Sequence, residues 1–410
     1  MRKLKFISIL IMVLFLSGCW DRMEIEDIGY VAVIGIDDGD FDNLRITFQI
    51  TNPQVGTSAK VQVDEPATNI ITLSSKDLIT ARDISSISIA RRLTFAHVKA
   101  IIVSEDFAKS DKLFSLIEAA QRDREIRREF DFIICKEKAS EFIRNNNPQF
   151  DTRVAKYYEF ISSRWKDTGF VPLSTLHRLS QRTVDDTSLY LGTYATTNED
   201  ERKLLAENEG DYLAGEINNQ DKNPTQMMGS AVFKKGKMIS TLTGDETRLS
   251  LILRPKTITN NLLMSFPDPL DKTERVTTTL IRGKNKINID VSGNYPIINV
   301  IVPIKLSINA IPSFVDYVEN QDNQDLLEKS IKEYLEDKTR ALEKRTQNEF
   351  HGEPFLWSSV ARKKFWLYED FESYNWMDKY PTAEVKVTFD VKIKDFGKHI
   401  TPSNVKRPKN

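Results

Sequence analysis

The stretch YVAVIGIDDGDFDNLRITFQI, residues 30–50, decides how the fold begins. Residues 30–36 form an apolar, strand-like run. In residues 44–50 apolar and polar side chains alternate, which predicts a second strand with one wet face. The segment DDGDFDN between them predicts a hairpin turn. The sequence therefore predicts that the fold begins with two strands of one sheet.

Helical and strand patterns alternate beyond this hairpin. Helical patterns occur at residues 76–92, 110–121, 154–166 and 173–182, and strand patterns at 100–103 and 130–135. Ser110 is the expected N-cap of the second helix. This alternation predicts an α/β N-terminal domain over residues 20–195.

The chain changes character after residue 195. Residues 196–224 are acidic, short of bulky apolar side chains and close to an Asn-Pro pair, which is typical of a linker or a small middle lobe. Beyond them, two strands around a KKGK turn lead to a helix, a hairpin is expected around RGKN, and residues 297–308 form a third strand. Residues 225–400 therefore predict a second, C-terminal domain.

A long charged helix is expected over residues 324–349. Apolar side chains fall near one face, while Glu328/Lys332 and Glu336/Arg340 are spaced as i,i+4 ion pairs. These apolar residues are Leu327, Ile331, Tyr334, Leu335 and Leu342. Their heptads are irregular, which favours a helix laid across a sheet over a coiled coil.

The last strand pattern, residues 384–395, is the most regular in the chain, and its wet face carries three lysines. The preceding aromatic segment contains Trp357, Trp366 and Trp376, for which core packing is expected and an exposed protein contact is the alternative. The fold class predicted is α+β (mixed α/β) and multidomain, with an α/β N-terminal domain and a β-rich C-terminal domain carrying one long helix.

The first eighteen residues predict an export signal. Residues 1–5 are positive and residues 6–16 are apolar except Ser8. As a helix this run would span roughly 16 Å, about half of the ~30 Å hydrocarbon core, which disfavours a transmembrane helix. Ser17 and Gly18 are the small residues expected before a cleavage site. Residues 1–18 are therefore predicted to be a signal peptide that is cleaved before Cys19.

Cys19 is the predicted site residue of the chain. The tetrad LSGC, residues 16–19, resembles the bacterial lipobox, in which diacylglycerol alkylates the thiol before cleavage. Two or more acyl chains, such as palmitate, hold a protein firmly at a membrane. The other cysteine is Cys135, so a lipidated Cys19 leaves no intrachain disulfide. About ten residues then form a short tether before the first strand.

The remaining composition and motifs argue against other classes of function. The net charge is −1, without the concentrated basic face that nucleic acid requires. Phosphate-binding glycine motifs and the hydrolase elbow do not occur, and four separated histidines give no metal motif. The DDGDFDN segment lacks the glycine and glutamate of a calcium loop. We therefore expect no enzyme activity, no cofactor and no catalytic or metal-binding residue.

Several segments together resemble the Ger(x)C family, the lipoprotein C subunits of nutrient germinant receptors of spores. They are LSGCWDRMEIEDIGYVAVIGID, ITFQITNP, HVKAIIVSEDFA with QRDREIRRE, GSAVFKKGKM with GDET, and WMDKYPTAEVKVTFDVKI. They follow the family order from residue 16 to about 397. The segment HGEPFLWSSV departs from the Asp-Ile-Phe-Gly-Phe-Gly-like motif that the family has after the long helix, so no role of that motif is carried over to this chain.

The resemblance implies a non-enzymatic subunit required for spore germination. It would be anchored through Cys19 on the outer face of the inner spore membrane, with integral-membrane A and B subunits as partners and no nucleic acid. The family fold is mixed α and β in three domains. The alternative is a solute-binding lipoprotein of a transporter, which requires two similar lobes around a cleft. A lipid-anchored hydrolase is a third class, without motif support.

Overall fold

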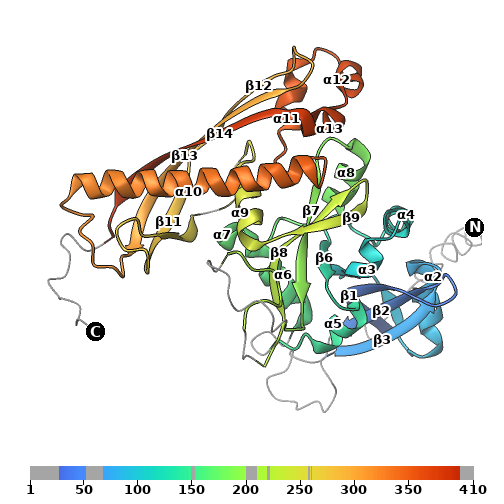
Figure 1. Cartoon of the computed structure of the whole chain (residues 1–410). Helices are drawn as coiled ribbons and strands as arrows, with labels where there is room; N and C mark the ends of the chain where they lie inside the picture. Colours follow the sequence, from blue (N-terminus) through green and yellow to red (C-terminus); the bar gives the residue numbers. More distant parts are fainter. Residues whose placement is uncertain are drawn as a thin grey trace, which may run out of the picture.

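Two β-sheets organise the protein. The computed structural model describes residues 27–51, 68–148, 153–199, 210–218, 222–256, 259 and 261–397. Within these ranges, nine strands form the first sheet and five form the second (Figure 1). Both sheets are mixed and both carry helices, which confirms the α+β fold class.

Four parallel strands form the centre of the nine-stranded sheet, and antiparallel strands extend it on both sides. The central strands are β1 (Ile28–Asp38), β5 (Ala100–Ser104), β6 (Asp131–Cys135) and β7 (Tyr190–Thr196). The outer strands are β2 (Leu44–Thr51), β3 (Thr68–Ser75), β8 (Gln226–Lys234) and β9 (Lys237–Leu242). The short β4 (Arg92–Thr94) pairs in parallel with the beginning of β1.

Helices cover both faces of this sheet. One face packs against α2 (Leu78–Ile84), α3 (Glu105–Ala108), α4 (Lys112–Ala120) and α8 (Leu176–Asp185). The other face packs against α5 (Ala139–Asn145) and α6 (Val154–Ser163), which α7 (Trp165–Thr168) follows. A strand covered on both faces has no wet side, which explains why residues 30–36 are continuously apolar.

The predicted hairpin at the start of the fold is confirmed. β1 and β2 pair antiparallel, with Asp38 opposite Leu44 at the turn. Phe41 and Asp42 adopt left-handed backbone with φ of 54° and 62°. Asp tolerates this conformation, and the Phe41 ring is 95% exposed. The acidic turn is therefore structural.

The five-stranded sheet carries one long helix along it (Figure 1). Its strands are β10 (Leu262–Pro267), β11 (Arg275–Arg282), β12 (Lys286–Asp290), β13 (Ile297–Ala310) and β14 (Glu384–Asp395). The helix is α10 (Gln321–Asn348), and its apolar face is the predicted one. Leu327, Ile331, Leu335 and Leu342 are at most 1% exposed, and Tyr334 packs at the edge of the same core. The helix-on-sheet prediction is confirmed.

The predicted hairpin around RGKN is wrong. β11 and β12 do not pair with each other; both pair with the same edge of β13 and follow one another along it. Residues 283–285 interrupt this line opposite Pro303, which has no N–H to give the ladder. The Gly283 N–H still donates to the Pro303 carbonyl at 2.8 Å. Residues 283–285 therefore separate two strands, β11 and β12, that pair one after the other with β13.

The i,i+4 ion pairs predicted within α10 are also wrong. Glu328 accepts from the backbone N–H of Ile393 at 2.7 Å and from Lys392 Nζ at 2.8 Å. Glu336 accepts from the backbone N–H of Phe389 at 3.1 Å. Because β14 is an edge strand, its outward N–H groups need acceptors. Both glutamates therefore bind β14, and neither binds the lysine or arginine one turn along its own helix.

The helices predicted from the sequence all have somewhat different bounds in the structure: 154–166 divides into α6 and α7, 173–182 becomes α8, and 324–349 becomes α10. The helix expected over 76–92 ends at Ile84, continues as a short 3-10 turn (Ser85–Ile87) and then becomes β4. The Ser85 hydroxyl donates to the Arg82 carbonyl at 2.6 Å, so it competes with the helical hydrogen bonds. The helix expected from Ser110 begins at Lys112, and its N-cap residue is Asp111.

One of the apolar cores spans both sheets. The helix α9 (Gly244–Ile252) is capped by Thr243 and Glu246 and is buried along most of its length. Its Leu249 and Ile252 pack with residues of β7 to β9 and with the inner face of the five-stranded sheet. β8 and β9, which the sequence assigned to the C-terminal domain, belong to the nine-stranded sheet. The predicted boundary at residue 225 therefore does not coincide with a boundary between sheets.

The predicted linker is partly packed. Within 196–224, residues 200–209 and 219–221 lie outside the described residues. Ala214 is 1% exposed and bonds to Met228 of β8, and Asp211 lies 2.9 Å from Lys338 of α10. The described part of this segment is therefore a peripheral lobe that contacts both sheet units.

Candidate functional site

Cys19, the site residue predicted from sequence, lies outside the described residues, as does the predicted signal peptide. The structure does show where the chain enters the fold. Ile28 begins β1 and lies opposite Arg92 of β4 at the amino-terminal edge of the parallel strands. In the part of the chain that the structure describes, no helix has the length and apolarity to cross a membrane.

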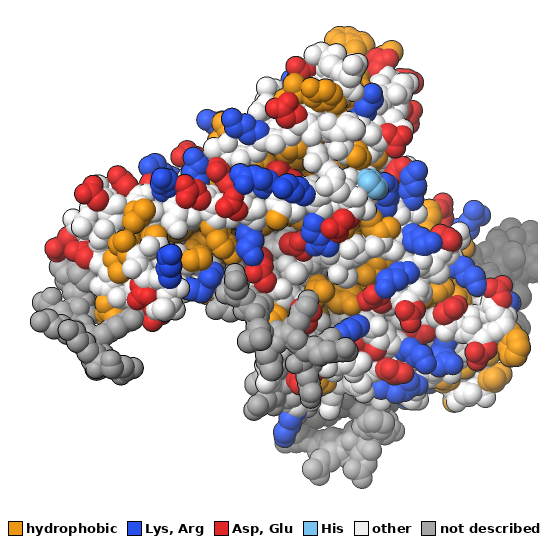
Figure 2. Space-filling view, in the orientation of Figure 1, with side chains coloured by type: hydrophobic (Ala, Val, Ile, Leu, Met, Phe, Trp, Pro, Cys, Tyr) orange, Lys and Arg blue, Asp and Glu red, His pale blue; other side chains and the backbone are white. Residues whose placement is uncertain are grey.

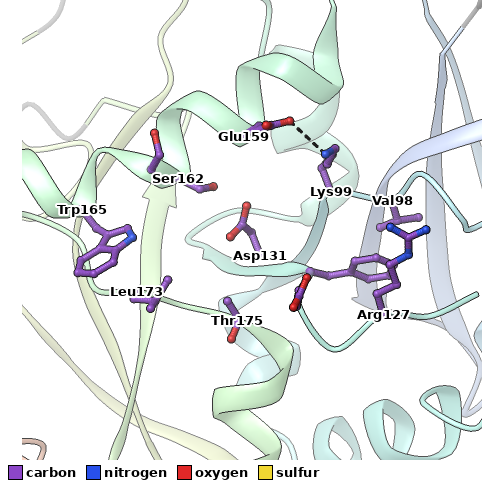
Figure 3. A pocket seen from close by; sticks show the side chains of 12 residues that line it. Val98, Lys99, Arg127, Asp131, Glu159, Ser162, Trp165, Leu173 and Thr175 are labelled. Atoms are coloured by element: carbon purple, nitrogen blue, oxygen red, sulfur yellow. Dashed lines mark hydrogen bonds and ion pairs between the residues drawn. The ribbon is translucent and has the colours of Figure 1, made fainter. Parts of the chain in front are cut away.

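A surface cavity of about 380 Å³ lies at the same edge, where β5 and β6 begin. Its walls come from the end of the loop before β6, from α6 and α7, and from the segment leading into α8. Charged, hydroxyl and apolar side chains contribute, including Lys99, Arg127, Asp131, Glu159, Ser162 and Trp165. Figure 3 shows Asp131 at the centre of this group, with Thr175 and Leu173 below it.

Asp131 is the most perturbed group in the cavity. It is half-buried, and burial raises the pKa of its carboxyl group to about 6, while a hydrogen bond from Ser162 acts in the opposite direction. Its backbone holds the site together, since the Asp131 N–H donates to the Lys99 carbonyl at 2.9 Å and the residue forms an isolated bridge with Thr175. Perturbed carboxyl groups in clefts mark candidate binding sites.

The other charges of the cavity pair at its rim. Lys99 Nζ lies 3.1 Å from Glu159 Oε2, and both side chains are about half exposed, so this pair contributes little to stability. Arg127 and Glu129 are exposed. Ser162 and Ser163 supply hydroxyl groups, but no histidine lines the cavity. This mixture of both charge signs can bind a polar group; it does not assemble a nucleophile with its base.

The histidines do not converge within the described residues. His97 is exposed and packs edge-on against Tyr30 with ring centroids 4.8 Å apart. His177 is exposed near the start of α8, and the exposed His351 lies 2.9 Å from the Gln347 carbonyl. His399 lies outside the described residues. In the described ranges, no group of three His, Cys, Asp or Glu side chains could hold a metal ion.

The three C-terminal tryptophans divide between core and surface. Trp357 and Trp376 are 0% and 2% exposed, and the Trp357 indole N–H donates to the Leu253 carbonyl at 3.1 Å. Trp366 is 94% exposed, beside the exposed Leu367 and Tyr368. Two of the three therefore build the shared core, as the sequence predicted.

The segment HGEPFLWSSV, noted in the sequence as a departure, joins the two sheet units. The Glu353 carbonyl accepts from the Leu189 N–H at 2.9 Å and from the Ser188 hydroxyl at 2.8 Å, at the start of β7. Arg254 Nε donates to the Pro354 carbonyl at 3.3 Å. The segment then continues into α11 (Ser358–Ala361). We call residues 351–357 the junction segment.

The Glu353 side chain is fully buried in this junction. Burial raises the pKa of its carboxyl group to about 7, against the Ser358 N–H, which donates to Oε1 at 2.9 Å, and the positive charge of Arg182. Arg254 is also buried, and desolvation lowers its pKa to about 9. Sequence analysis missed Glu353 and Asp131. For Glu353, the available signal in the sequence was a charged residue between Gly352 and Pro354.

The surface charges do not form large areas of one sign on the face shown in Figure 2, where basic and acidic side chains are interspersed. In the loop QRDREIRREF, residues 121–130, the acidic and basic side chains lie in different environments. Asp123 and Glu125 turn toward Arg82, with N–O distances of 2.9 and 3.1 Å, whereas the four arginines of the loop are exposed. The acids therefore do not pair with their sequence neighbours.

Comparisons with known proteins match both parts of the chain. Residues 21–195 match the family described as spore germination protein N-terminal domain, and residues 228–397 match the one described as spore germination B3/GerAC like, C-terminal. Spore germination protein B3 of Bacillus subtilis (strain 168) is 22% identical over 402 residues, which cover 96% of this chain and 98% of that protein.

Two further similarities agree with this. Spore germination protein KC of the same organism is 29% identical over 146 residues, which cover 35% of this chain and only 36% of that protein. The crystal structure of the GerBC protein shares the fold, with a TM-score of 0.53 and 18% identity over 88% of this chain and 96% of that chain. Both family domains are thus present in order over most of its length, and the chain belongs to the Ger(x)C family of spore germination proteins.

Proposed function

We propose that this protein is a membrane-anchored lipoprotein subunit of a nutrient germinant receptor that is required for spore germination. Its role is non-enzymatic interaction and assembly. Lipid on Cys19 holds it on the outer face of the inner spore membrane, where it assembles with the integral-membrane A and B subunits. No cofactor takes part.

The observation that carries the proposal is the position of the LSGC tetrad directly before the start of the family match. The N-terminal family domain begins at residue 21, two residues after Cys19. β1 begins at Ile28, so the sequence between the lipid site and the fold is short. The similarity to spore germination proteins B3 and KC supports the receptor context.

We also propose a division of the chain into four parts: a signal peptide (1–18), an N-terminal domain (20–195), a linker or small middle lobe (196–224) and a C-terminal domain (225–400). The two matched ranges leave residues 196–227 between them, in agreement with a middle lobe.

This structure does not have the architecture that the alternative, a solute-binding lipoprotein of a transporter, requires. That class needs two similar α/β lobes around a ligand cleft. Here a nine-stranded sheet with helices on both faces meets a five-stranded sheet with one long helix, through a shared core. The cavity at Asp131 lies at the edge of the first sheet.

The experiment is a pair of cysteine variants, Cys19→Ala and Cys135→Ala. The second is a matched control, because Cys135 is the other cysteine of the chain and is fully buried in β6. We expect Cys19→Ala to lose the lipid mass from its N-terminal peptide, to leave the membrane fraction and to slow nutrient-triggered germination. Cys135→Ala should keep its lipid. Unchanged membrane retention and germination of Cys19→Ala would refute the proposal.

Assembly is tested separately by co-purification from detergent-solubilised spore membranes. The wild-type protein should recover integral-membrane subunits, and Cys19→Ala should recover fewer. Recovery of the wild-type protein alone would count against the receptor role even if the lipid is present.

A further inference from the structure

Four exposed arginines lie in the loop 121–130, between α4 and β6. Glu125, which turns inward to Arg82, also accepts from the backbone N–H of Phe95 at 2.6 Å and from the Thr94 hydroxyl at 2.9 Å. Thr94 belongs to β4, which pairs with the first residues of β1. These bonds fix the loop beside the point where the chain enters the fold.

Other exposed residues extend this edge. The 3-10 turn after α2 contacts β4 and carries Ile87, whose side chain is 79% exposed. We call the set the arginine edge; its members are Ile87, Arg92, Arg122, Arg124, Arg127 and Arg128, all of which are exposed and all of which except Ile87 are cationic. Glu129 is the exposed acid of the same loop. The edge therefore presents five guanidinium groups and one apolar side chain, with Glu129 and Asp83, which lines the same surface hollow as Arg92, as exposed acids.

The length of the chain before β1 places this edge near the anchor. Eight residues, Trp20 to Asp27, follow Cys19 before β1 begins. Fully extended they reach roughly 30 Å at ~3.5 Å per residue. A compact domain of this length is roughly 55 Å across, from its expected radius of gyration. A lipid on Cys19 therefore keeps the arginine edge close to the bilayer while the opposite end of the molecule stands away from it.

The chemistry of the edge matches phospholipid headgroups. Guanidinium groups bind phosphate oxygens with two parallel hydrogen bonds, and Arg is more weakly hydrated than Lys. An exposed isoleucine among cations suits the boundary between headgroups and acyl chains. Cationic residues are attracted to anionic leaflets only within about one Debye length, roughly 8–10 Å, and a tether that reaches at most about 30 Å allows the edge to come that close.

We propose that the arginine edge is a docking surface for anionic phospholipid, which orients the anchored protein on its membrane. This inference rests on the proposed lipid anchor at Cys19. It adds a second, electrostatic contact that fixes which face of the molecule meets the bilayer and which faces remain available to other subunits.

The test uses the full-length lipidated protein, reconstituted in vesicles of phosphatidylcholine alone or with phosphatidylglycerol. A fluorophore is attached at Ser88→Cys, exposed beside Ile87, or at Glu372→Cys, exposed on α12 (Tyr368–Tyr374). A lipid-borne quencher reports proximity to the bilayer. We expect strong quenching at position 88 in phosphatidylglycerol vesicles, weaker quenching in phosphatidylcholine, and little at position 372.

Charge variants sharpen the test. In Arg124→Gln/Arg127→Gln/Arg128→Gln the docked-to-undocked ratio should fall on the order of a hundredfold, since each arginine near an anionic surface contributes about fivefold. The matched control, Lys284→Gln/Lys286→Gln/Lys363→Gln, removes the same charge from exposed positions on the five-stranded sheet unit and should leave quenching unchanged.

The outcomes separate this inference from the proposed function. Lipidated protein whose position 88 is quenched no more than position 372, or equally in both vesicle types, would overturn the inference and leave the anchor standing. Quenching that appears only after integral-membrane subunits are added would overturn it in favour of a protein partner. A missing lipid mass on the N-terminal peptide would instead refute the proposed function.

Discussion

Replacing Glu353 by Gln should flatten the dependence of stability on pH. In the folded protein burial raises the pKa of Glu353 to about 7, compared with about 4.5 for an exposed glutamate. One pKa unit corresponds to ~1.4 kcal/mol, so ionising Glu353 costs the folded state about 3 kcal/mol. The raised pKa means that the protonated form favours folding. This stability is fully present below about pH 4.5 and is lost as the pH rises through 7.

In Glu353→Gln the side chain at position 353 is uncharged at every pH, so the variant does not lose this stability as the pH rises. The assay is urea unfolding of purified protein at pH 5, 6, 7 and 8, followed by tryptophan fluorescence, since Trp357 lies in the junction segment. The free energy of unfolding of the wild type, relative to the variant, should fall by about 2.5 kcal/mol from pH 5 to pH 8, because part of the full effect is already lost at pH 5. Glu343, whose pKa is also raised to about 7, titrates in both proteins and cancels in this difference.

Glu372→Gln, on the exposed surface of α12, is the control and should follow the wild type at every pH. Equal pH dependence of the wild type and Glu353→Gln would refute the reasoning. It would mean that the junction ionises Glu353 without penalty and that nearby Arg182 compensates its burial.

Two further predictions concern α10 and the sheet beneath it. Ile331→Ala, at a fully buried position, should lower the free energy of unfolding by about 2–5 kcal/mol, whereas alanine at the exposed Lys329 should change it by less than about 0.5 kcal/mol; a loss below 1 kcal/mol for Ile331→Ala would contradict the packing described. Glu328→Ala/Glu336→Ala should speed amide hydrogen exchange at Phe389 and Ile393 with little change at β11, and unchanged protection of both amides would show that the carboxylates are not their acceptors.

The sequence predicted most elements whose period is set by local packing. The hairpin of residues 30–50, the apolar face of α10 and the final strand β14 follow directly from alternation with period two or from helical spacing. Each of these patterns is determined by which side of one element faces a core, and that information is local.

Partners across the fold were not predictable in this way. RGKN has turn chemistry, but its outcome depends on Pro303 in a strand that comes later in the chain. Glu328 and Glu336 have ion-pair spacing on a helix, yet an unpaired strand edge offers them backbone N–H groups. The same holds for the site: Asp131 and Glu353 acquire raised pKa values from neighbours that only the folded chain brings to them.

The two glutamates that bind β14 have a consequence for the lipid-anchored state proposed above. Lipid-anchored copies diffuse in two dimensions at high local concentration, and an open strand edge would let one copy extend the sheet of the next. α10 occupies that edge in advance, with one carboxylate for Ile393 and another for Phe389 four residues away. At these two positions β14 has no backbone N–H left to offer a neighbouring copy, so α10 opposes extension of the sheet along this edge.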